Sequence, residues 1–463
     1  MKKYDVIIVG AGAAGVFLSY ELTKLDVNAR ILMLDKGAPL EKRVCPIKLG
    51  KTTSCIKCAP CHIMNGYGGA GTLSDGKYNI TTQFGGDLHA YIGQDKAMEL
   101  MEYVDEVLCS FGGSEAKLYS TGNSELKTIA LRNNLNLLDA KVRHLGTDRN
   151  VKILDKICNY TKDKVEMKFY TGVEDVSKNS DGTFKVLASD GEEYQCNEVI
   201  LATGRSGSKW VSGVCEKMDI KLEQNRVDIG VRVELPAVIF KHITDEVYES
   251  KIVYKTDKYN DLVRTFCMNP YGEVVSENTN GIVTVNGHSY ADPSLRTENT
   301  NFALLVSNKL TAPFNDSNEY GESIARLSNM LGGGVLMQRF GDLVKGRRSS
   351  ERRMAKCFTR PTLKATPGDL SLVMPKRQLD NIIEMIYALD KIAPGTANED
   401  TLLYGVEVKF YNSKVQVDEN LETVVKGLYA LGDGSGVTHS LSQASASGVL
   451  LGRILSEKYG KAN

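Results

Sequence analysis

Apolar positions near the N-terminus follow the pattern of a strand, a helix and a second strand. Residues 5–9 form a short run rich in β-branched residues without polar alternation, which is typical of a parallel strand covered on both faces. A helical stretch extends to about residue 25, and a second strand is expected at residues 31–34. The order predicts a βαβ unit.

Farther along the chain, the periodicity changes twice. From about residue 93 to 164, apolar residues recur every three or four positions, which indicates helices. The stretch 226–289 instead alternates and carries turn signals, so it is expected to be rich in antiparallel strands. Further strands are expected at 166–170, 183–188, 198–202, 404–410 and 427–431, and helices at 376–392 and 442–459.

The composition excludes several classes of protein. The 463 residues suffice for two or three domains, and 57 basic residues balance 57 acidic ones. We therefore expect no nucleic-acid partner. No apolar run approaches the roughly 18 residues of a membrane span, so we expect no membrane partner and, because the N-terminus is interpreted as uncleaved, a cytoplasmic protein.

The first glycine cluster has the spacing of a dinucleotide-binding turn. Gly10 permits a tight turn, Gly12 lets the backbone approach a pyrophosphate, and Gly15 lets helix and strand pack closely. Phosphates would then lie at the positive end of the helix. Asp35 follows the second strand, where its carboxylate can accept ribose hydroxyls.

Two further turns favour FAD over NAD. A late strand leads into Gly432-Asp433-Gly434, and a central strand ends in Ala202-Thr203-Gly204. With these motifs the chain resembles the flavoproteins with two dinucleotide-binding domains, the superfamily that includes glutathione reductase. The resemblance implies a single FAD held by all three turns, with Asp433 accepting from ribityl or ribose hydroxyls.

The chain also resembles the bacterial and archaeal family of FAD-dependent dehydrogenases. The stretches that carry this resemblance are 66–77, 227–234, 265–270, 346–349, 401–404 and 432–434. No second glycine fingerprint occurs between residues 150 and 230, which argues against a separate NAD(P)H domain.

The expected fold class is α/β, with a Rossmann-like FAD-binding domain and an inserted β-rich (α+β) substrate domain. The expected FAD-binding domain is discontinuous and comprises residues 1–90, 150–225 and 395–463. A helical segment is expected at 91–149 and the inserted substrate domain at 226–394. The full set of expected cofactor-binding residues is Gly10, Gly12, Ala13, Ala14, Gly15, Asp35, Lys36, Gly68, Gly69, Ala70, Gly71, Ser74, Ala202, Thr203, Gly204, Gly432, Asp433, Gly434 and Ser442.

Four of the ten cysteines fall within seventeen residues, at Cys45, Cys55, Cys58 and Cys61. Three thiols on one loop with two residues between neighbours have the spacing of ligands to a [4Fe-4S] cluster, and Cys45 is the candidate fourth ligand. Zinc, a redox pair of Cys58 and Cys61, and unliganded structural thiols are the alternatives.

Two residues are candidates for catalysis. Lys77 follows the glycine-rich stretch and is a candidate to stabilise a reduced flavin, although a solvated lysine is the alternative. His439 precedes the last helix and is a candidate to donate to the flavin or to shuttle a proton, with a capping role as the alternative. A basic cluster at residues 345–353 is expected to be a solvated face, with an anionic ligand as the alternative.

The predicted function is that of an FAD-dependent dehydrogenase or reductase. A hydride or an electron pair would pass between flavin N5 and an organic small-molecule substrate, with an iron-sulfur cluster as electron relay. The electron donor would be ferredoxin-like or NAD(P)H. The alternatives are a flavin-dependent thiol-disulfide reductase that uses Cys58 and Cys61, and a noncatalytic flavin-binding redox sensor.

Overall fold

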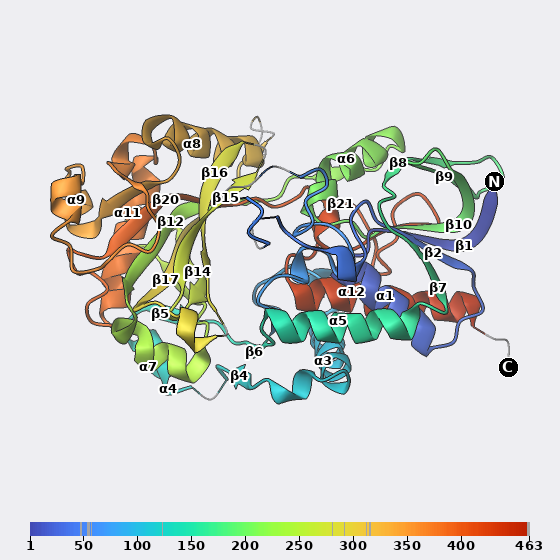
Figure 1. The fold of residues 1–463 in the computed structure, drawn as a ribbon, viewed down its shortest axis with the longest axis horizontal. Coiled ribbons are helices and arrows are strands. Elements are labelled where there is room, and N and C mark those ends of the chain that lie inside the picture. The colour runs from blue at the N-terminus through green and yellow to red at the C-terminus, as the bar shows by residue number, and fades with distance from the viewer. Residues whose placement is uncertain are drawn as a thin grey trace. The chain divides into compact units, whose positions relative to one another are not determined.

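The structure, a computed structural model, describes residues 1–460 except 47–48, 53–55, 57, 123, 280, 291, 312 and 314–315. The chain divides into two compact units (Figure 1). Unit 1 comprises Met1–Leu118, Val142–Gln224 and Asn412–Asn463, and unit 2 comprises Tyr119–Lys141 and Asn225–Tyr411. Unit 1 is thus assembled from three stretches of sequence that unit 2 interrupts twice.

Unit 1 contains a mixed, mostly parallel sheet in the order β7-β2-β1-β10-β9-β8, with β22 paired to β10. Strands β7, β2, β1, β10 and β22 run parallel, and β9 and β8 are antiparallel. The strands that lie in or begin in unit 1 are β1 (Lys2–Val9), β2 (Ile31–Leu34), β3 (Lys77–Ile80), β4 (Leu118–Ser120), β7 (Val165–Lys168), β8 (Val173–Lys178), β9 (Phe184–Ala188), β10 (Glu193–Leu201), β11 (Leu222–Glu223), β21 (Lys414–Val415) and β22 (Leu428–Ala430). Its helices are α1 (Ala13–Lys24), α2 (His89–Ile92), α3 (Gln94–Ser110), α5 (Thr147–Thr161), α6 (Ser208–Lys217) and α12 (Leu441–Tyr459).

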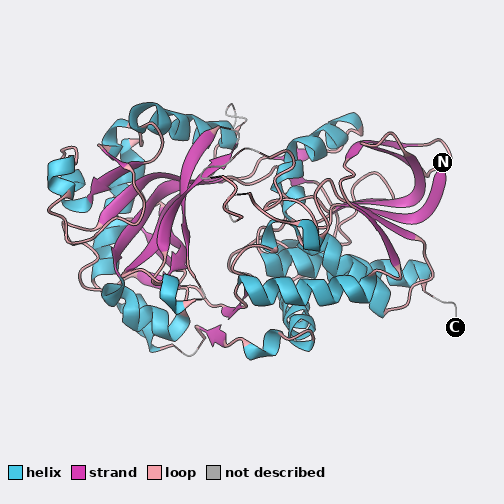
Figure 2. Ribbon diagram, in the orientation of Figure 1, coloured by secondary structure: helices cyan, strands magenta, loops and turns pink. Residues whose placement is uncertain are grey.

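Alternation along β1 supplies two apolar layers. Val6 and Ile8 are buried in a core shared with α1, α3, α5 and α12, which cover one face of the sheet (Figure 2). Ile7 and Val9 belong to a second core, with α6 and the antiparallel strands. Both faces are therefore covered, which explains why β1 has no polar alternation.

Unit 2 is built on an eight-stranded sheet in the order β19-β18-β20-β12-β17-β14-β13-β5. Its strands are β5 (Leu135–Leu137), β12 (Val227–Pro236), β13 (Ile252–Lys255), β14 (Leu262–Asn269), β15 (Glu273–Thr279), β16 (Ile282–His288), β17 (Asn299–Asn308), β18 (Leu336–Arg339), β19 (Thr366–Pro367) and β20 (Leu402–Lys409), and β6 (Lys141–His144) begins at its boundary. Its helices are α4 (Glu125–Arg132), α7 (Ala237–Val247), α8 (Ser317–Gly332), α9 (Phe340–Val344), α10 (Glu351–Met354) and α11 (Lys376–Asp390).

The two faces of the central strand β12 differ in chemistry. Its odd-numbered residues 227–235 are apolar and belong to a core that includes buried residues of α7 and α11. Its even-numbered residues Asp228, Arg232 and Glu234 are buried as well, but strand alternation places them on the opposite face. One face of β12 therefore contributes to a hydrophobic core, and the other face has a row of buried charged residues.

Each buried charge on this face has polar partners. The Arg232 guanidinium donates to Glu407 at 3.0 Å and to the Asn301 side chain at 2.9 Å, and both charged side chains are almost inaccessible. Glu234 accepts from the hydroxyl of Tyr404, and Asp228 pairs with Arg264. Pairing of this kind is required when charges are buried.

The α/β fold class expected from the sequence is confirmed, but two stretches were interpreted incompletely. The expected helical segment 91–149 contains three short strands, β4, β5 and β6, because strands of three or four residues are too short to give a periodic signal. The expected β-rich stretch 226–289 contains helix α7, whose buried residues at positions 237, 240, 243, 244 and 247 have helical spacing. None of the helices described is long and apolar enough to cross a membrane.

Replacing Arg232 with methionine should strongly destabilise the protein. The change leaves Glu407 buried without its guanidinium partner, and we expect a loss of about 3–5 kcal/mol in the free energy of unfolding. Urea denaturation followed by circular dichroism is the suitable measurement, because the single tryptophan, Trp210, lies in unit 1 and does not report on this sheet. The control is Arg326→Met on α8, an exposed residue paired with Glu322. Equal stability of the two variants would contradict the account of the buried pair.

Candidate functional site

Three turns of unit 1 meet at the carboxyl ends of the parallel strands β1, β10 and β22. The amide of Ala202 donates to the carbonyl of Val9 at 2.9 Å, and the amide of Gly434 donates to the carbonyl of Thr203 at 2.8 Å. Ligands of open α/β sheets bind at this edge. The structure therefore brings together the three glycine-containing turns expected from the sequence.

The first turn is too close to its neighbours for side chains at two of its glycines. Gly10 has φ +110°, and a Cβ there would lie 2.6 Å from the carbonyl oxygen of Ala202. A Cβ at Gly15 would lie 2.2 Å from the carbonyl oxygen of Gly10. At Gly12, by contrast, a Cβ would meet only the oxygen of Ala202 at 3.9 Å, so the space beside this residue is open to a ligand.

The open space lies at the N-terminus of α1. Gly12 is the N-cap of this twelve-residue helix and has no side chain to accept from the first-turn amides. Free amides and the helix dipole together favour a bound anion. The local geometry thus fits a pyrophosphate without any change in the backbone.

The glycine-rich stretch after the cysteines packs on the first turn. The amide of Gly68 donates to the carbonyl of Ala11 at 2.7 Å, and a Cβ at Gly69 would lie 3.0 Å from the Cα of Gly12. Gly71 approaches Leu441 at the start of α12. Ser74 lies farther along and donates its hydroxyl to the carbonyl of Gly71 at 2.6 Å, so this hydroxyl is used within its own loop.

Asp35 connects the second strand to the first turn. One of its carboxylate oxygens accepts from the amide of Ala11 at 2.8 Å and the other accepts from the amide of Gly37 at 2.7 Å. Each oxygen keeps a further lone pair for a ribose hydroxyl. Lys36, the next residue, donates to the carbonyl of Ser206 at 3.3 Å and connects the loop after β2 to the residues that follow the central turn.

Asp433 in the late turn is a carboxylate with a lowered pKa. Its side chain accepts from the Arg205 guanidinium at 2.7 Å and contacts His439 Nδ1 at 3.1 Å. Burial alone would raise the pKa of Asp433, but Arg205 and His439 outweigh it and lower the pKa to about 2. Asp433 is therefore an ionised acceptor at neutral pH.

Arg205 was not among the residues expected from the sequence. Its position directly after Ala202-Thr203-Gly204 was the available signal, because a residue following this turn lies at the same sheet edge.

Several hydroxyls near these turns are buried. The Oγ atoms of Thr203, Thr438 and Ser442 are inaccessible and have no hydrogen-bond partner among the described residues. An unsatisfied buried hydroxyl costs on the order of 1–3 kcal/mol, which a polar ligand can recover. Thr438 was not expected from the sequence, whereas Thr203 and Ser442 were.

The two candidate catalytic residues have different surroundings. His439 is 9% exposed and is held by Asp433, so it lies with the late turn. Lys77 begins β3, is 12% exposed and pairs with Asp75 at 3.0 Å. The catalytic role of Lys77 stays a prediction.

The cysteine segment is only partly described. Cys55 and its neighbours at 53 and 54 lie outside the described residues, while Cys45, Cys58 and Cys61 are half-buried free thiols. Within the part of the chain that is described, no three histidine, cysteine or acidic side chains come together as a metal site. The [4Fe-4S] cluster and zinc therefore stay predictions.

A buried arginine that the sequence interpretation missed fixes the chain between the cysteines and the glycine-rich stretch. Arg43 donates to the carbonyls of His62, Ile63 and Tyr67 at 3.0, 2.6 and 2.6 Å. Burial lowers the pKa of Arg43 to about 10, so it remains charged at neutral pH. Three carbonyl acceptors on one guanidinium hold this segment in a single conformation.

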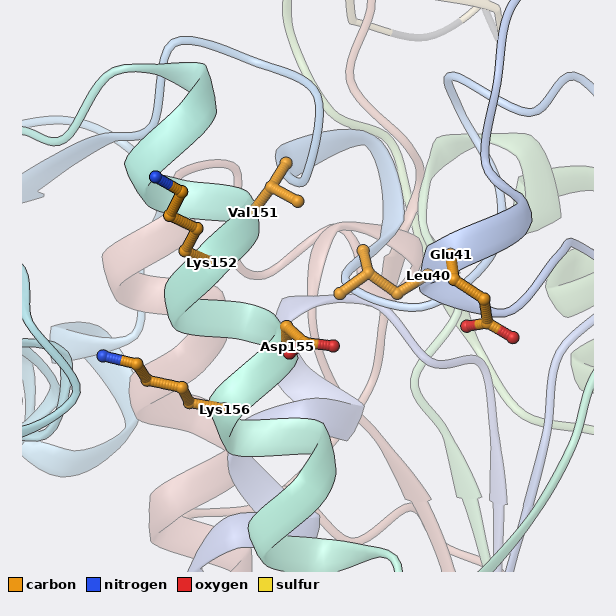
Figure 3. Close-up of a pocket in the computed structure, with 6 residues that line it drawn as sticks. All are labelled: Leu40, Glu41, Val151, Lys152, Asp155 and Lys156. Atoms are coloured by element: carbon orange, nitrogen blue, oxygen red, sulfur yellow. The ribbon is translucent and has the colours of Figure 1, made fainter.

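A separate hollow of about 390 Å³ lies between the segment 40–41 and α5 (Figure 3). It is lined by Leu40, Glu41, Val151, Lys152, Asp155 and Lys156. None of these is among the expected site residues, and four of the six are charged. The three turns, rather than this hollow, are therefore the candidate functional site.

Residues 227–410, a part of unit 2 and less than half of the chain, match the family model described as FAD-dependent protein, C-terminal domain-like. For this part of the chain, the match confirms the resemblance to FAD-dependent proteins that the sequence motifs indicated. No curated protein matches the chain.

Three solved structures are similar to the chain at low identity. Glycine oxidase from Geobacillus kaustophilus is 12% identical with a TM-score of 0.41, and the likeness covers 100% of this chain and 96% of that one. NikD, an unusual amino acid oxidase essential for nikkomycin biosynthesis, is also 12% identical with a TM-score of 0.41, and the likeness covers 100% of this chain and 96% of NikD. FrdA of E. coli quinol fumarate reductase is 14% identical with a TM-score of 0.43, covering 100% and 72% of the two chains. At TM-scores this low, the likenesses carry no argument about this chain.

The pH dependence of stability should report the ion pair of Asp433. Because its folded pKa lies below the ordinary value of 3.8, the stabilisation is complete above about pH 4 and is lost as the pH falls toward 2. We expect Asp433→Asn to lower the free energy of unfolding of the FAD-free protein by about 2 kcal/mol at pH 6 and by progressively less below pH 4. Urea titrations at several pH values measure this.

The matched control is Asp163→Asn, an exposed residue of unit 1 that should change the unfolding free energy little at any pH. A loss at Asp433→Asn that stayed constant from pH 6 to acid conditions would contradict the lowered pKa.

Proposed function

We propose that unit 1 binds FAD and that the protein is an FAD-dependent oxidoreductase acting on a small organic substrate. The observation that carries the proposal is the open space at Gly12, bounded by backbone at the N-terminus of α1 and facing a sheet edge where two other glycine turns meet. The bound flavin would supply hydride or electron-pair transfer.

Each part of the proposed site suits one part of the cofactor. The first-turn amides of α1 would hold the pyrophosphate, Asp35 would accept from the ribose, and ionised Asp433 would accept from ribityl hydroxyls. A dinucleotide such as NAD would use the first turn equally well. The late turn and the FAD-dependent family match of residues 227–410 support FAD instead.

For the substrate and the electron partners, the proposal names only classes of molecule. Dehydrogenase or reductase chemistry, with a ferredoxin-like protein or NAD(P)H as donor, is the form of the proposal that follows from the sequence resemblance. His439, held by Asp433, is the proposed proton-handling residue because an imidazole fixed by a carboxylate keeps one ring nitrogen oriented. Lys77 is the proposed stabiliser of negative charge on reduced flavin.

Replacing Gly12 with valine should abolish FAD binding while the protein still folds. Gly12 has an extended backbone that any residue adopts, and its Cβ position meets no described atom closer than 3.9 Å. A valine would therefore fill only the space assigned to the pyrophosphate. Titration of FAD-free protein with FAD, followed by flavin fluorescence, should show at least about 100-fold weaker binding, from the loss of phosphate contacts worth roughly 3 kcal/mol or more.

Gly213→Val is the matched control, because a Cβ at this position of α6 meets nothing within 4 Å. It should bind FAD as the unmodified protein does. Unchanged FAD affinity in Gly12→Val, or an unmodified protein that takes up no FAD, would refute the proposal.

The iron-sulfur relay is a separate element of the proposal. If Cys45, Cys55, Cys58 and Cys61 hold a [4Fe-4S] cluster, anaerobically purified protein should contain iron and sulfide, and Cys58→Ser or Cys61→Ser should each remove them. Cys109→Ser, at another half-buried free thiol of unit 1, is the control and should leave iron unchanged.

Other outcomes of this assay select the alternatives. Zinc in place of iron would indicate a structural site. Absence of both metals, with disulfide turnover that is lost in Cys58→Ser, would indicate a thiol-disulfide reductase. A metal-free protein whose four thiols alkylate freely would exclude the cluster and zinc and leave the flavin proposal intact.

A further inference from the structure

One segment of unit 2 carries a concentrated positive charge. Residues 345–364 contain eight lysines and arginines and a single acidic residue, Glu351, in a chain whose charges balance overall. The segment begins directly after α9, which is labelled in Figure 1, and includes α10 and its flanking loops. We call it the basic segment.

The basic segment is anchored to the fold by its uncharged residues. The Ser349 amide donates to the carbonyl of Gly368 at 2.9 Å, and its hydroxyl donates to buried Asp342 at 2.8 Å. Met354 and Cys357 are buried in an apolar cluster of unit 2. The backbone is therefore fixed, and the long cationic side chains are left at the surface.

Three of its cations lie within 4 Å of a carboxylate, and two of these three share the carboxylate of Asp342. Lys345 pairs with Glu399, while Arg347 and Arg353 approach Asp342 at 2.8 and 3.8 Å. The remaining five have no carboxylate partner in the described part of the chain and are exposed, namely Arg348, Arg352, Lys356, Arg360 and Lys364.

Large apolar side chains protrude beside these cations. Phe358 and Val344, within or next to the basic segment, are 54% and 45% exposed. The end of α8 adjoins the far end of the segment, where the Thr366 hydroxyl donates to the carbonyl of Gly332 at 2.7 Å. Met330 and Leu331 in that helix end are 72% and 46% exposed. Cations and protruding apolar groups thus occur together.

We propose that the basic segment docks unit 2 on an anionic lipid surface. Unpaired cations gain about 1 kcal/mol each near such a surface, and apolar side chains among them can enter the headgroup region. Three of the four protruding side chains, Val344, Met330 and Leu331, are not aromatic. This favours lipid over single-stranded nucleic acid, whose bases stack on several aromatic rings, and the balanced charge of the whole chain argues against a general nucleic-acid partner. A site for a small anion usually has buried cations, whereas the five unpaired cations of the basic segment are exposed. The proposal is independent of FAD and revises the expectation of no membrane partner, which concerned spanning segments.

Co-sedimentation with vesicles tests the proposal. The full-length protein should sediment with phosphatidylglycerol vesicles and not with phosphatidylcholine vesicles, and raising NaCl to about 0.5 M should release it. A triple variant with glutamate at Arg348, Arg352 and Lys356 should bind on the order of 100-fold more weakly, from the loss of about 1 kcal/mol at each position. Phe358→Ser should weaken binding and leave the salt dependence unchanged.

The control triple variant has glutamate at Lys255, Lys309 and Lys391, which are exposed residues of unit 2 outside the basic segment and carry no ion pair in the described chain. It has the same net charge as the first triple variant and should bind vesicles nearly as the unmodified protein does. Equal losses in the two triple variants, or no sedimentation with phosphatidylglycerol, would overturn the proposal. Binding to duplex DNA or polyglutamate in place of the vesicles would also overturn it and identify a soluble polyanion as the partner.

Discussion

The candidate site depends on backbone segments that approach one another too closely for any side chain. At the carboxyl edge of the unit 1 sheet, Gly15 lies against the carbonyl of Gly10, and Gly434 lies against the carbonyl of Thr203, where a Cβ would be 2.2 Å from oxygen in both cases. These contacts force α1, β10 and β22 into one arrangement. They also remove side chains from the edge, so that amides and carboxylates, rather than apolar groups, face a ligand.

Unit 2 follows a different physical rule. Its central strand β12 has one apolar face and one face of buried charges, and each of these charges has an ion-pair or hydrogen-bond partner, as Arg232 has in Glu407. Such pairs contribute little net stability compared with apolar packing, but breaking one is costly. The result is a β-rich unit whose polar face requires a particular set of partners on neighbouring strands.

Local sequence was sufficient for the elements whose signal lies within about 20 residues. The spacing of Gly10, Gly12 and Gly15 predicted the first turn, and the α/β class followed from the order of strands and helices. Contacts between distant segments were not accessible in this way. Arg205 reaches Asp433 across 228 residues, and Arg43 holds carbonyls about 20 residues away through a side chain that no pattern distinguishes from a solvated arginine. Tertiary packing alone decides such pairs.

Amide hydrogen exchange on FAD-free protein, with and without added FAD, tests the central claim most directly, because it reports where a ligand lies as well as whether it binds. We expect FAD to slow exchange at all three turns together, at residues 11–15, 203–205 and 433–436, and NAD to slow it at the first turn at most. Protection by FAD that is confined to other parts of the chain, or no protection at all, would contradict the assignment of these turns as a flavin site.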